Sequence, residues 1–404
     1  MKLLTFLGTT PYWKTDYVWS DKRCETEFIA EAIASWLHLQ DIVVFLTEKA
    51  EQSGNWKQLQ ERLQGRARAV RIPDGRTEQE IWEIFEKVVG QVHQHDVVVL
   101  DVTHAFRSLP MLLTVAAAFL RAVREVRVEH IFYAPSEREQ RESTVMDLIL
   151  LLHWMDWMEA VRRFRETGDA RWIGDTLTQT HDTLRATATG EPRSLKKAGK
   201  ELGNLAQALH LARPIEVAQV ATRLRAILPE ASQEVTKWVK PFSLLVDKVT
   251  QQTSQLSYEQ PQTLNRNNLQ TQLDLIHQLL QYGLTMQAVQ AAREWLINWA
   301  IWYKAGRGSL QKDDWLSDKS RNSAENDLNS AFRPDANKAV VPEWLREPEL
   351  HKVLQQLWPG LCNLRNDIAH CGMRLQPLCA KDLQGQSEEY LRMLEEVMNL
   401  SNPE

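Results

Sequence analysis

Cysteine is scarce in this sequence, and its spacing does not suit cross-linking or metal binding. The 404 residues contain four cysteines, namely Cys24, Cys362, Cys371 and Cys379. They form no CxxC pair and show no zinc-ligand spacing with histidine. A disulfide framework and a zinc site are therefore not indicated, and no metal ligand is assigned. Isolated thiols of this kind are typical of proteins from a reducing compartment.

Long apolar runs are also missing. The opening MKLLTFLGTT has one lysine and a short apolar run without a cleavage-site pattern, so it is too brief for a signal peptide. The most apolar stretch, VMDLILLLHWM, is interrupted by Asp147 and His153 and falls short of a membrane span. We therefore expect a cytoplasmic protein with no membrane partner.

Positive charge is not in excess, because 48 lysines and arginines face 53 acidic residues and give a formal net charge of −5. Proteins that coat nucleic acids depend on many phosphate contacts from basic side chains. Any nucleic-acid site is therefore expected to be a local pocket. The 43% hydrophobic and 25% charged content is that of an ordinary soluble protein, and the length allows two or three domains.

The first third of the chain alternates β-branched runs with amphipathic stretches, which is the pattern of βαβ units. It predicts strands at residues 2–8, 41–47, 67–72, 96–103 and 126–134, and helices near 25–39, 51–63, 77–93 and 108–122. Successive strands joined by helices form parallel sheets. We therefore expect a Rossmann-like α/β domain.

From about residue 143 onward the strand pattern ends, and leucine, tryptophan and alanine recur at helical spacing. This predicts an all-α remainder. Trp295, Trp299 and Trp302 follow that spacing and favour a core or dimer interface over a surface for stacking RNA bases. Residues 305–338 are polar and indicate a long loop-like insert. The predicted domains are 1–142 (Rossmann-like, ligand-sensing), 143–258 (helical connector) and 259–404 (helical, with the second site described below).

Two polar loops come after the first and fourth predicted strands, where open parallel sheets bind their ligands. FLGTTPY supplies Gly8, Thr9 and Thr10, and DVTHAFRSLP supplies Thr103, His104 and Arg107. Glycine allows close backbone approach, and a guanidinium suits bidentate phosphate contact. The loops predict a site for a phosphate-bearing, nucleotide-like ligand, and without GxGxxG a dinucleotide is not indicated. The alternative is that these residues only form turns and cap the next helix.

A second polar group lies in LRNDIAHCGM near the end of the chain. Asn366 and His370 are four residues apart on one helix face, and the neighbouring Arg365 can reach the same edge. Leu361, Leu364 and Ile368 are expected on the buried side, and Gly372 is a plausible helix stop. Histidine can move a proton and arginine can stabilise phosphorane charge, so the set suits metal-independent RNA cleavage. The alternative is a surface helix with incidental polar residues.

Both groups together make the chain resemble the CRISPR-associated CARF–HEPN ribonucleases of type III systems. FLGTTPY and DVTHAFRSLP are similar to the ligand loops of CARF domains, and RNDIAH is similar to the RxxxxH signature of HEPN domains. The resemblance spans most of the chain and is weakest around residues 143–260. It implies a homodimer in which a cyclic oligoadenylate activates the cutting of single-stranded RNA, with no cofactor required and no metal.

The resemblance also assigns roles to residues. It makes Arg365 and His370 catalytic with Asn366 in support. It places the messenger, a cyclic tetra- or hexa-adenylate, against six residues of the two loops: Gly8, Thr9, Thr10, Thr103, His104 and Arg107. Two other functions stay open: a non-catalytic messenger sensor whose helical half binds a protein or nucleic acid, and a DNA-binding regulator. The regulator is less favoured because there is no convincing basic recognition helix.

Overall fold

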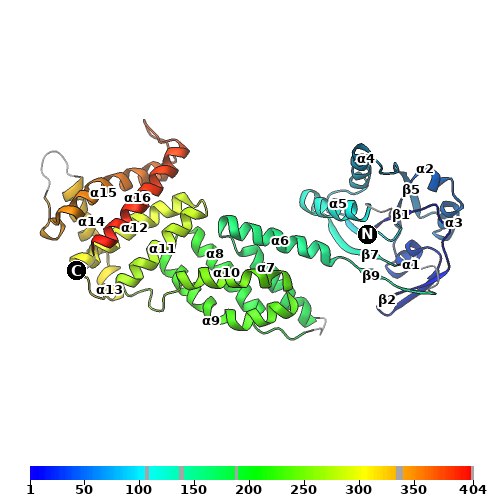
Figure 1. The fold of residues 1–404 in the computed structure, drawn as a ribbon, viewed down its shortest axis with the longest axis horizontal. Coiled ribbons are helices and arrows are strands. Elements are labelled where there is room, and N and C mark those ends of the chain that lie inside the picture. Colours follow the sequence, from blue (N-terminus) through cyan, green and yellow to red (C-terminus); the bar gives the residue numbers. More distant parts are fainter. Residues whose placement is uncertain (105–108, 136–140, 187–189, 334–339, 402–404) are drawn as a thin grey trace. The chain divides into compact units, whose positions relative to one another are not determined.

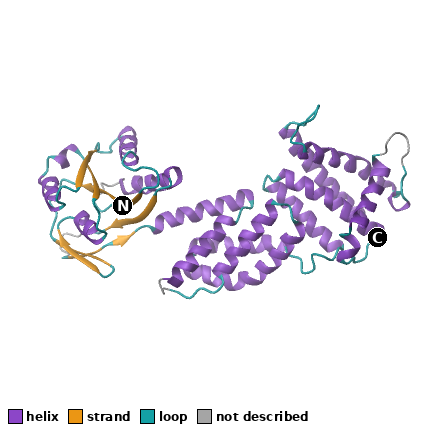
Figure 2. Cartoon of the chain, turned by 180° about the vertical axis from the view of Figure 1, so that it is seen from behind, coloured by secondary structure: helices purple, strands orange, loops and turns teal. Residues whose placement is uncertain are grey.

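The computed structural model describes residues 1–104, 109–135, 141–186, 190–333 and 340–401. The chain divides into two compact units, Met1–Asp156 and Trp157–Glu404 (Figure 1). Every strand of the described residues belongs to the first unit, and the second unit is built of helices (Figure 2). The predicted fold class, a Rossmann-like sheet domain followed by a helical part, is confirmed.

The first unit is organised around a six-stranded sheet. Its order is β5 (Ala67–Arg71), β4 (Asp41–Leu46), β1 (Lys2–Leu7), β6 (Val97–Asp101), β7 (Arg127–Tyr133) and β9 (Met146–Asp147). The first five strands are parallel, and β9 runs antiparallel to β7. The chain passes from β1 outward through β4 to β5, then returns to β6 on the other side of β1. The switch in strand order therefore lies between β1 and β6, where both predicted ligand loops begin.

Helices cover both faces of this sheet because alternate residues of each strand point to opposite sides. Leu3 packs in one core with residues of α1 (Ile29–Trp36) and α3 (Gly54–Arg62). Leu4 packs in the other core with residues of α4 (Glu78–Val89) and α5 (Leu109–Arg124). A short helix, α2 (Glu48–Glu51), comes after β4. The apolar runs of β1, β4 and β6 are thus buried on both faces.

Four strands of this unit were not predicted from the sequence, namely the edge strand β9 and the three strands of a second, smaller sheet. β2 (Thr15–Trp19) and β3 (Lys22–Thr26) form an antiparallel hairpin, and β8 (Glu142–Thr144) pairs with β2 in a second sheet. The helix predicted from residue 25 begins only at Ile29. The hairpin strands are short and partly exposed, so their alternation was hidden among polar residues. The expectation that strands end at about residue 143 was also wrong, because β8 continues through that residue and β9 lies beyond it.

The helical part begins with α6 (Leu150–Thr167), which crosses the boundary between the units. It continues with α7 (Arg171–Ala186), α8 (Leu195–His210), α9 (Pro214–Trp238), α10 (Lys240–Leu256), α11 (Arg266–Gln281), α12 (Thr285–Lys304), α13 (Lys312–Trp315), α14 (Asp318–Phe332), the 3₁₀ turn η1 (Glu343–Leu345), α15 (Pro348–Ala369) and α16 (Ala380–Leu400). One hydrophobic core joins residues from α6 to α16. Trp295, Trp299 and Trp302 are buried in it, so the core interpretation is confirmed.

The segment 305–338 is not the loop that its polar composition suggested. It contains α13 and α14, and Ser317 caps α14 by accepting a hydrogen bond from the N–H of Ser320. Trp315 is fully buried and donates its Nε1–H to the carbonyl of Gln262 at 2.8 Å. A few apolar side chains at helical spacing therefore anchor a mostly polar segment to the core.

Glycines allow α7 and α8 to pack with their backbones in contact. A Cβ on Gly199 would lie 2.5 Å from the carbonyl oxygen of Gly174, whereas a Cβ on Gly203 would meet no atom within 4 Å. We expect Gly199→Ala to lower the free energy of unfolding by about 1–3 kcal/mol because the helices must separate. The matched control Gly203→Ala on the same helix should raise it by up to about 1 kcal/mol. Urea denaturation measures both; equal effects of the two substitutions would contradict this packing.

Candidate functional site

A pocket of about 490 Å³ opens at the carboxyl ends of β1, β4 and β6 in the first unit. It brings together five of the six residues assigned to the ligand: Gly8, Thr9, Thr10, Thr103 and His104. They come from two loops about a hundred residues apart in sequence, and strand order alone makes them neighbours. Arg107, the sixth, lies outside the described residues.

The loop after β1 is held in shape by two side chains. The backbone N–H of Gly8 donates to the hydroxyl oxygen of Tyr12 at 2.7 Å. From α3, Asn55 donates its Nδ2–H to the carbonyl oxygens of Gly8 at 3.1 Å and Thr10 at 2.9 Å. These contacts give hydrogen-bond partners to three backbone groups of the loop. Thr9 and Thr10 are left exposed at its rim.

The loop after β6 is anchored by the buried Asp101 at the end of that strand. Its carboxylate accepts the hydroxyl hydrogen of Thr5 at 2.6 Å and the backbone N–H of Thr103 at 3.0 Å. The hydroxyl of Thr103 in turn accepts the N–H of Ala134 at 3.0 Å. These hydrogen bonds to residues of the sheet therefore fix the backbone just before His104.

His104 presents an unused nitrogen to this site. Its ring lies 4.2 Å from the ring of Tyr12, and its Nε2 is shielded from solvent with no hydrogen-bond partner in the described part of the chain. Burial lowers the pKa of His104, against the opposing effect of the Asp101 carboxylate. Burial also raises the pKa of Tyr12 to about 12. Both rings are therefore uncharged near neutral pH, and His104 keeps a free polar atom for a ligand.

Two cations of the pocket were missed from the sequence. Lys49 on α2 and Arg76 after β5 line it, and Arg76 forms an ion pair with Asp74 at 3.0 Å. Neither lies in a recognisable motif. Each comes a few residues after a predicted strand, however, so the rule that placed the other two loops at strand ends could have found them. With both cations, the pocket combines positive charge, hydroxyl groups and an imidazole.

The second candidate site lies at the end of α15. Arg365 and Asn366 are half-buried there, and His370 is the exposed C-cap residue, whose N–H donates to the carbonyl of Asn366 at 3.0 Å. Gly372 adopts a φ of +70°, as the predicted helix stop requires. Among the described residues, no hydrogen bond or ion pair engages the side chains of Arg365, Asn366 or His370. They are thus available to a substrate.

The buried side of this helix matches the prediction in part. Leu361 and Leu364 are fully buried, but Ile368 is only partly buried. The side chain that the sequence analysis did not single out is Asp367, which is buried beside Asn366. The sequence did not indicate that this carboxylate is buried. Three of the other five residues of RNDIAH are also polar, so the motif resembles an exposed segment.

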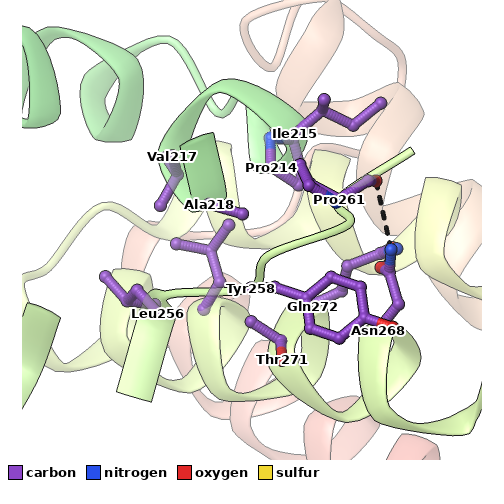
Figure 3. Close-up of a pocket in the computed structure, with 11 residues that line it drawn as sticks. Pro214, Ile215, Val217, Ala218, Leu256, Tyr258, Pro261, Asn268, Thr271 and Gln272 are labelled. Carbon is purple, nitrogen blue, oxygen red and sulfur yellow. Dashed lines mark hydrogen bonds between the residues drawn. The ribbon is translucent and has the colours of Figure 1, made fainter. Parts of the chain in front are cut away.

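Another hollow in the helical unit is too small for a nucleotide. It lies between α9, α11 and the segment that joins α10 to α11, and Asn268 donates to the carbonyl of Pro261 at its edge (Figure 3). Its volume is about 10 Å³, which is room for about one water molecule. The polar set at the end of α15 is therefore the stronger candidate in this unit.

The described residues contain neither a metal-binding cluster nor a membrane-spanning helix. No group of three or more histidine, cysteine, aspartate or glutamate side chains there is arranged to hold a metal ion. No helix in those ranges combines the length and the apolar character needed to cross a membrane.

Comparison with known proteins identifies two regions. Residues 2–136 match the family model of the CARF domain of the CRISPR system endoribonuclease Csx1, and residues 153–260 match that of the second domain of CRISPR-associated protein MJ1674. The MJ1674 protein of Methanocaldococcus jannaschii is 30% identical over 111 residues, which cover 26% of this chain and 18% of that protein. The chain thus matches less than a fifth of the length of this curated relative.

A solved structure is similar along the whole chain. Enterococcus italicus Csm6 bound to cyclic hexa-2'-fluoro-hexa-dAMP covers 100% of this chain and 95% of its own, with 12% identity and a TM-score of 0.43. The two family models match successive regions, and both describe CRISPR-associated proteins. The resemblance predicted from the ligand loops is confirmed at this level: residues 2–136 are similar to a CARF domain, and residues 153–260 are similar to a domain of another CRISPR-associated protein.

Proposed function

We propose that this protein is an endoribonuclease of type III CRISPR antiviral defence that a cyclic oligoadenylate switches on. The observation that carries the proposal is the set Arg365, Asn366 and His370, whose side chains are unengaged at the end of α15 in a chain with a CARF domain. We further propose that residues 1–142 are the CARF domain, 143–258 a helical connector and 259–404 a HEPN domain. The matches over 2–136 and 153–260 support the first two parts.

The pocket of the first unit supports the proposed activator. Lys49 and Arg76 supply positive charge for phosphates, and Thr9, Thr10 and Thr103 supply hydroxyl groups. A volume of about 490 Å³ is in the range of small-ligand sites and suits part of a cyclic oligoadenylate. A symmetric ring placed on a two-fold axis would use the same pocket of two copies. Such a ligand shifts the protein toward the active arrangement if it binds that arrangement more tightly.

The chemistry proposed for the second site needs only the three side chains. His370 moves a proton to or from the ribose 2′-hydroxyl or the leaving oxygen. Arg365 stabilises negative charge on the phosphorane oxygens, and Asn366 orients the histidine or the phosphate. His370 stands at the helix end with its side chain exposed, so single-stranded RNA can reach it. No metal is part of this proposal.

An exposed apolar stripe supports the proposed homodimer. Met111, Val115, Phe119 and Val123 recur every four residues on α5, and all four are exposed. Contiguous exposed apolar surface of this kind marks partner interfaces. We propose that the same stripe of a second copy covers it, because one stripe meeting itself across a two-fold axis forms a closed dimer.

Charge placed on this stripe should separate the copies. For Val115→Glu with Val123→Glu we expect the mass in light scattering to fall from twice 46.7 kDa to 46.7 kDa, because four carboxylates would be buried together. Gln58→Glu with Gln60→Glu, which adds the same charge to exposed positions of α3, should leave the dimer intact. A double variant that stays dimeric would contradict the proposed interface.

One assay separates the proposed function from its alternative. Purified protein is mixed with fluorescent single-stranded RNA and with cyclic tetra-adenylate or cyclic hexa-adenylate. We expect one of the rings to stimulate cleavage. Ring binding without cleavage of diverse RNAs would favour the non-catalytic messenger sensor.

A further inference from the structure

Asp367 is a buried carboxylate inside the second candidate site, and the proposed reaction gives it no role. It lies between Asn366 and His370 in sequence, and only 2% of it is exposed. Its Oδ2 accepts the backbone N–H of Leu378 at 3.3 Å, and its Oδ1 lies 3.4 Å from Nε of Arg374. Oδ1 has no hydrogen bond within the described ranges. The carboxylate therefore faces the segment on the C-terminal side of the catalytic helix.

That segment, residues 371–379, links α15 to α16 and is tied down by polar contacts. Arg374 donates Nη1–H to the carbonyl of Asn363 at 3.4 Å, besides facing Asp367. Met373 donates its N–H to the carbonyl of His370 at 2.8 Å. The side chain of Met373 is 86% exposed, and that of Leu375 is completely exposed. The tip of the loop is thus held by Asp367 and backbone groups, and apolar packing involves only its far end, where Leu378 packs against the hydrophobic core.

Stability alone is a poor explanation for this arrangement. Removing a carboxylate from water costs several kcal/mol, and one long hydrogen bond and one ion pair offset that cost only in part. Groups that break the rules of stable packing are expected at functional sites. The position of Asp367 fits this expectation, because it is one residue from Asn366 and three from His370.

The placement of His370 depends on the turn that comes directly after it. As the C-cap residue it stands where the helix ends, and the next two residues have positive φ angles, +52° at Cys371 and +70° at Gly372. The N–H of Gly372 donates to the carbonyl of Asp367 at 3.0 Å. Both the main chain and the side chain of Asp367 therefore fix the turn on which the His370 side chain is carried.

We propose that Asp367 is a positioning residue: through Arg374 and the N–H of Leu378 it holds the loop 371–379 against α15 and so keeps His370 aligned with Arg365. This inference rests on the proposed ribonuclease function. Asp367 touches no reacting atom in it. A misplacement of a catalytic group by about 1 Å can lower turnover about a hundredfold, so a loosened loop should be visible in kcat.

The test is a double-mutant cycle with Asp367→Asn and Arg374→Gln. Asparagine keeps the shape and the acceptor for Leu378 but loses the charge that pairs with Arg374. We expect each single variant to lower kcat about tenfold, and the double variant to lower it by the same factor, with KM and ring affinity unchanged. The exposed residues of α16 supply charge-matched controls, Asp382→Asn and Arg392→Gln, which should keep the wild-type kcat.

Thermal unfolding of each variant is measured alongside, and kcat is expressed per folded protein, so that a purely structural role would leave it unchanged. A wild-type kcat in Asp367→Asn would overturn the inference, and so would losses that multiply in the double variant. Arg365→Ala serves as the reference for the function itself. If the wild-type protein cleaves no more RNA than Arg365→Ala, the proposed function fails, and the role of Asp367 falls with it.

Discussion

Replacing Arg365 or His370 by alanine is expected to lower ring-stimulated RNA cleavage by at least about 100-fold. Arginine stabilises the charge that develops on the phosphorane, and histidine transfers the proton; loss of either contribution typically has an effect of this size. Neither side chain has a hydrogen-bond or ion-pair partner among the described residues, so their removal should leave the fold intact. Initial rates of cleavage of a fluorescent RNA, measured with saturating ring, give the result.

Arg346 offers a matched control on the same part of the chain. It precedes His351 by five residues, as Arg365 precedes His370, and it is exposed at the end of η1. His351 instead turns its Nδ1 to the carbonyl of Leu345 at 3.1 Å and packs against Phe332. Arg346→Ala should therefore keep the wild-type rate. Equal rates for Arg365→Ala and Arg346→Ala would show that the RNDIAH set is not the catalytic one.

The second large effect is expected in the pocket of the first unit. Lys49→Ala combined with Arg76→Ala should weaken binding of the activating ring about 100-fold at low salt. Each charge-assisted contact to a phosphate contributes about 1.4 kcal/mol, which is about tenfold in affinity. Isothermal titration calorimetry at several salt concentrations measures the loss, and the affinity of the variant should depend less steeply on salt.

Lys57→Ala is the control for this variant. Lys57 is exposed on α3 in the same unit but does not line the pocket, so the substitution removes a charge without removing a predicted contact. Ring affinity should stay at the wild-type value. Unchanged affinity in the double variant would mean that Lys49 and Arg76 do not face the phosphates.

Sequence patterns predicted the parts of the fold that depend on continuous burial. The strands β1, β4 and β6 are apolar runs buried on both faces. Such runs can be recognised in the sequence alone. The hairpin of β2 and β3 was missed because its side chains alternate over only five residues per strand. The helices of 305–338 were missed because only five buried apolar residues anchor the described part of a mostly polar segment.

The candidate sites divide in the same way. Spacing along one helix was sufficient to relate Arg365, Asn366 and His370, and strand ends related Gly8 to His104. Contacts between segments far apart in the chain could not be predicted from the sequence. The role proposed for Asp367 depends on where the loop after its helix returns, and the burial of His104 Nε2 depends on the ring of Tyr12. Neither of these two contacts produces a periodic pattern or a motif in the sequence.

In the function proposed here, a cyclic oligoadenylate switches on metal-independent RNA cleavage at His370. The most direct test is the rate of cleavage of a fluorescent single-stranded RNA in EDTA, with cyclic tetra-adenylate, cyclic hexa-adenylate or no ring, for the wild type and His370→Ala. We expect strong stimulation of the wild type by one ring and none in the variant. RNA that stays intact although a ring binds, or cleavage that His370→Ala retains, would contradict it.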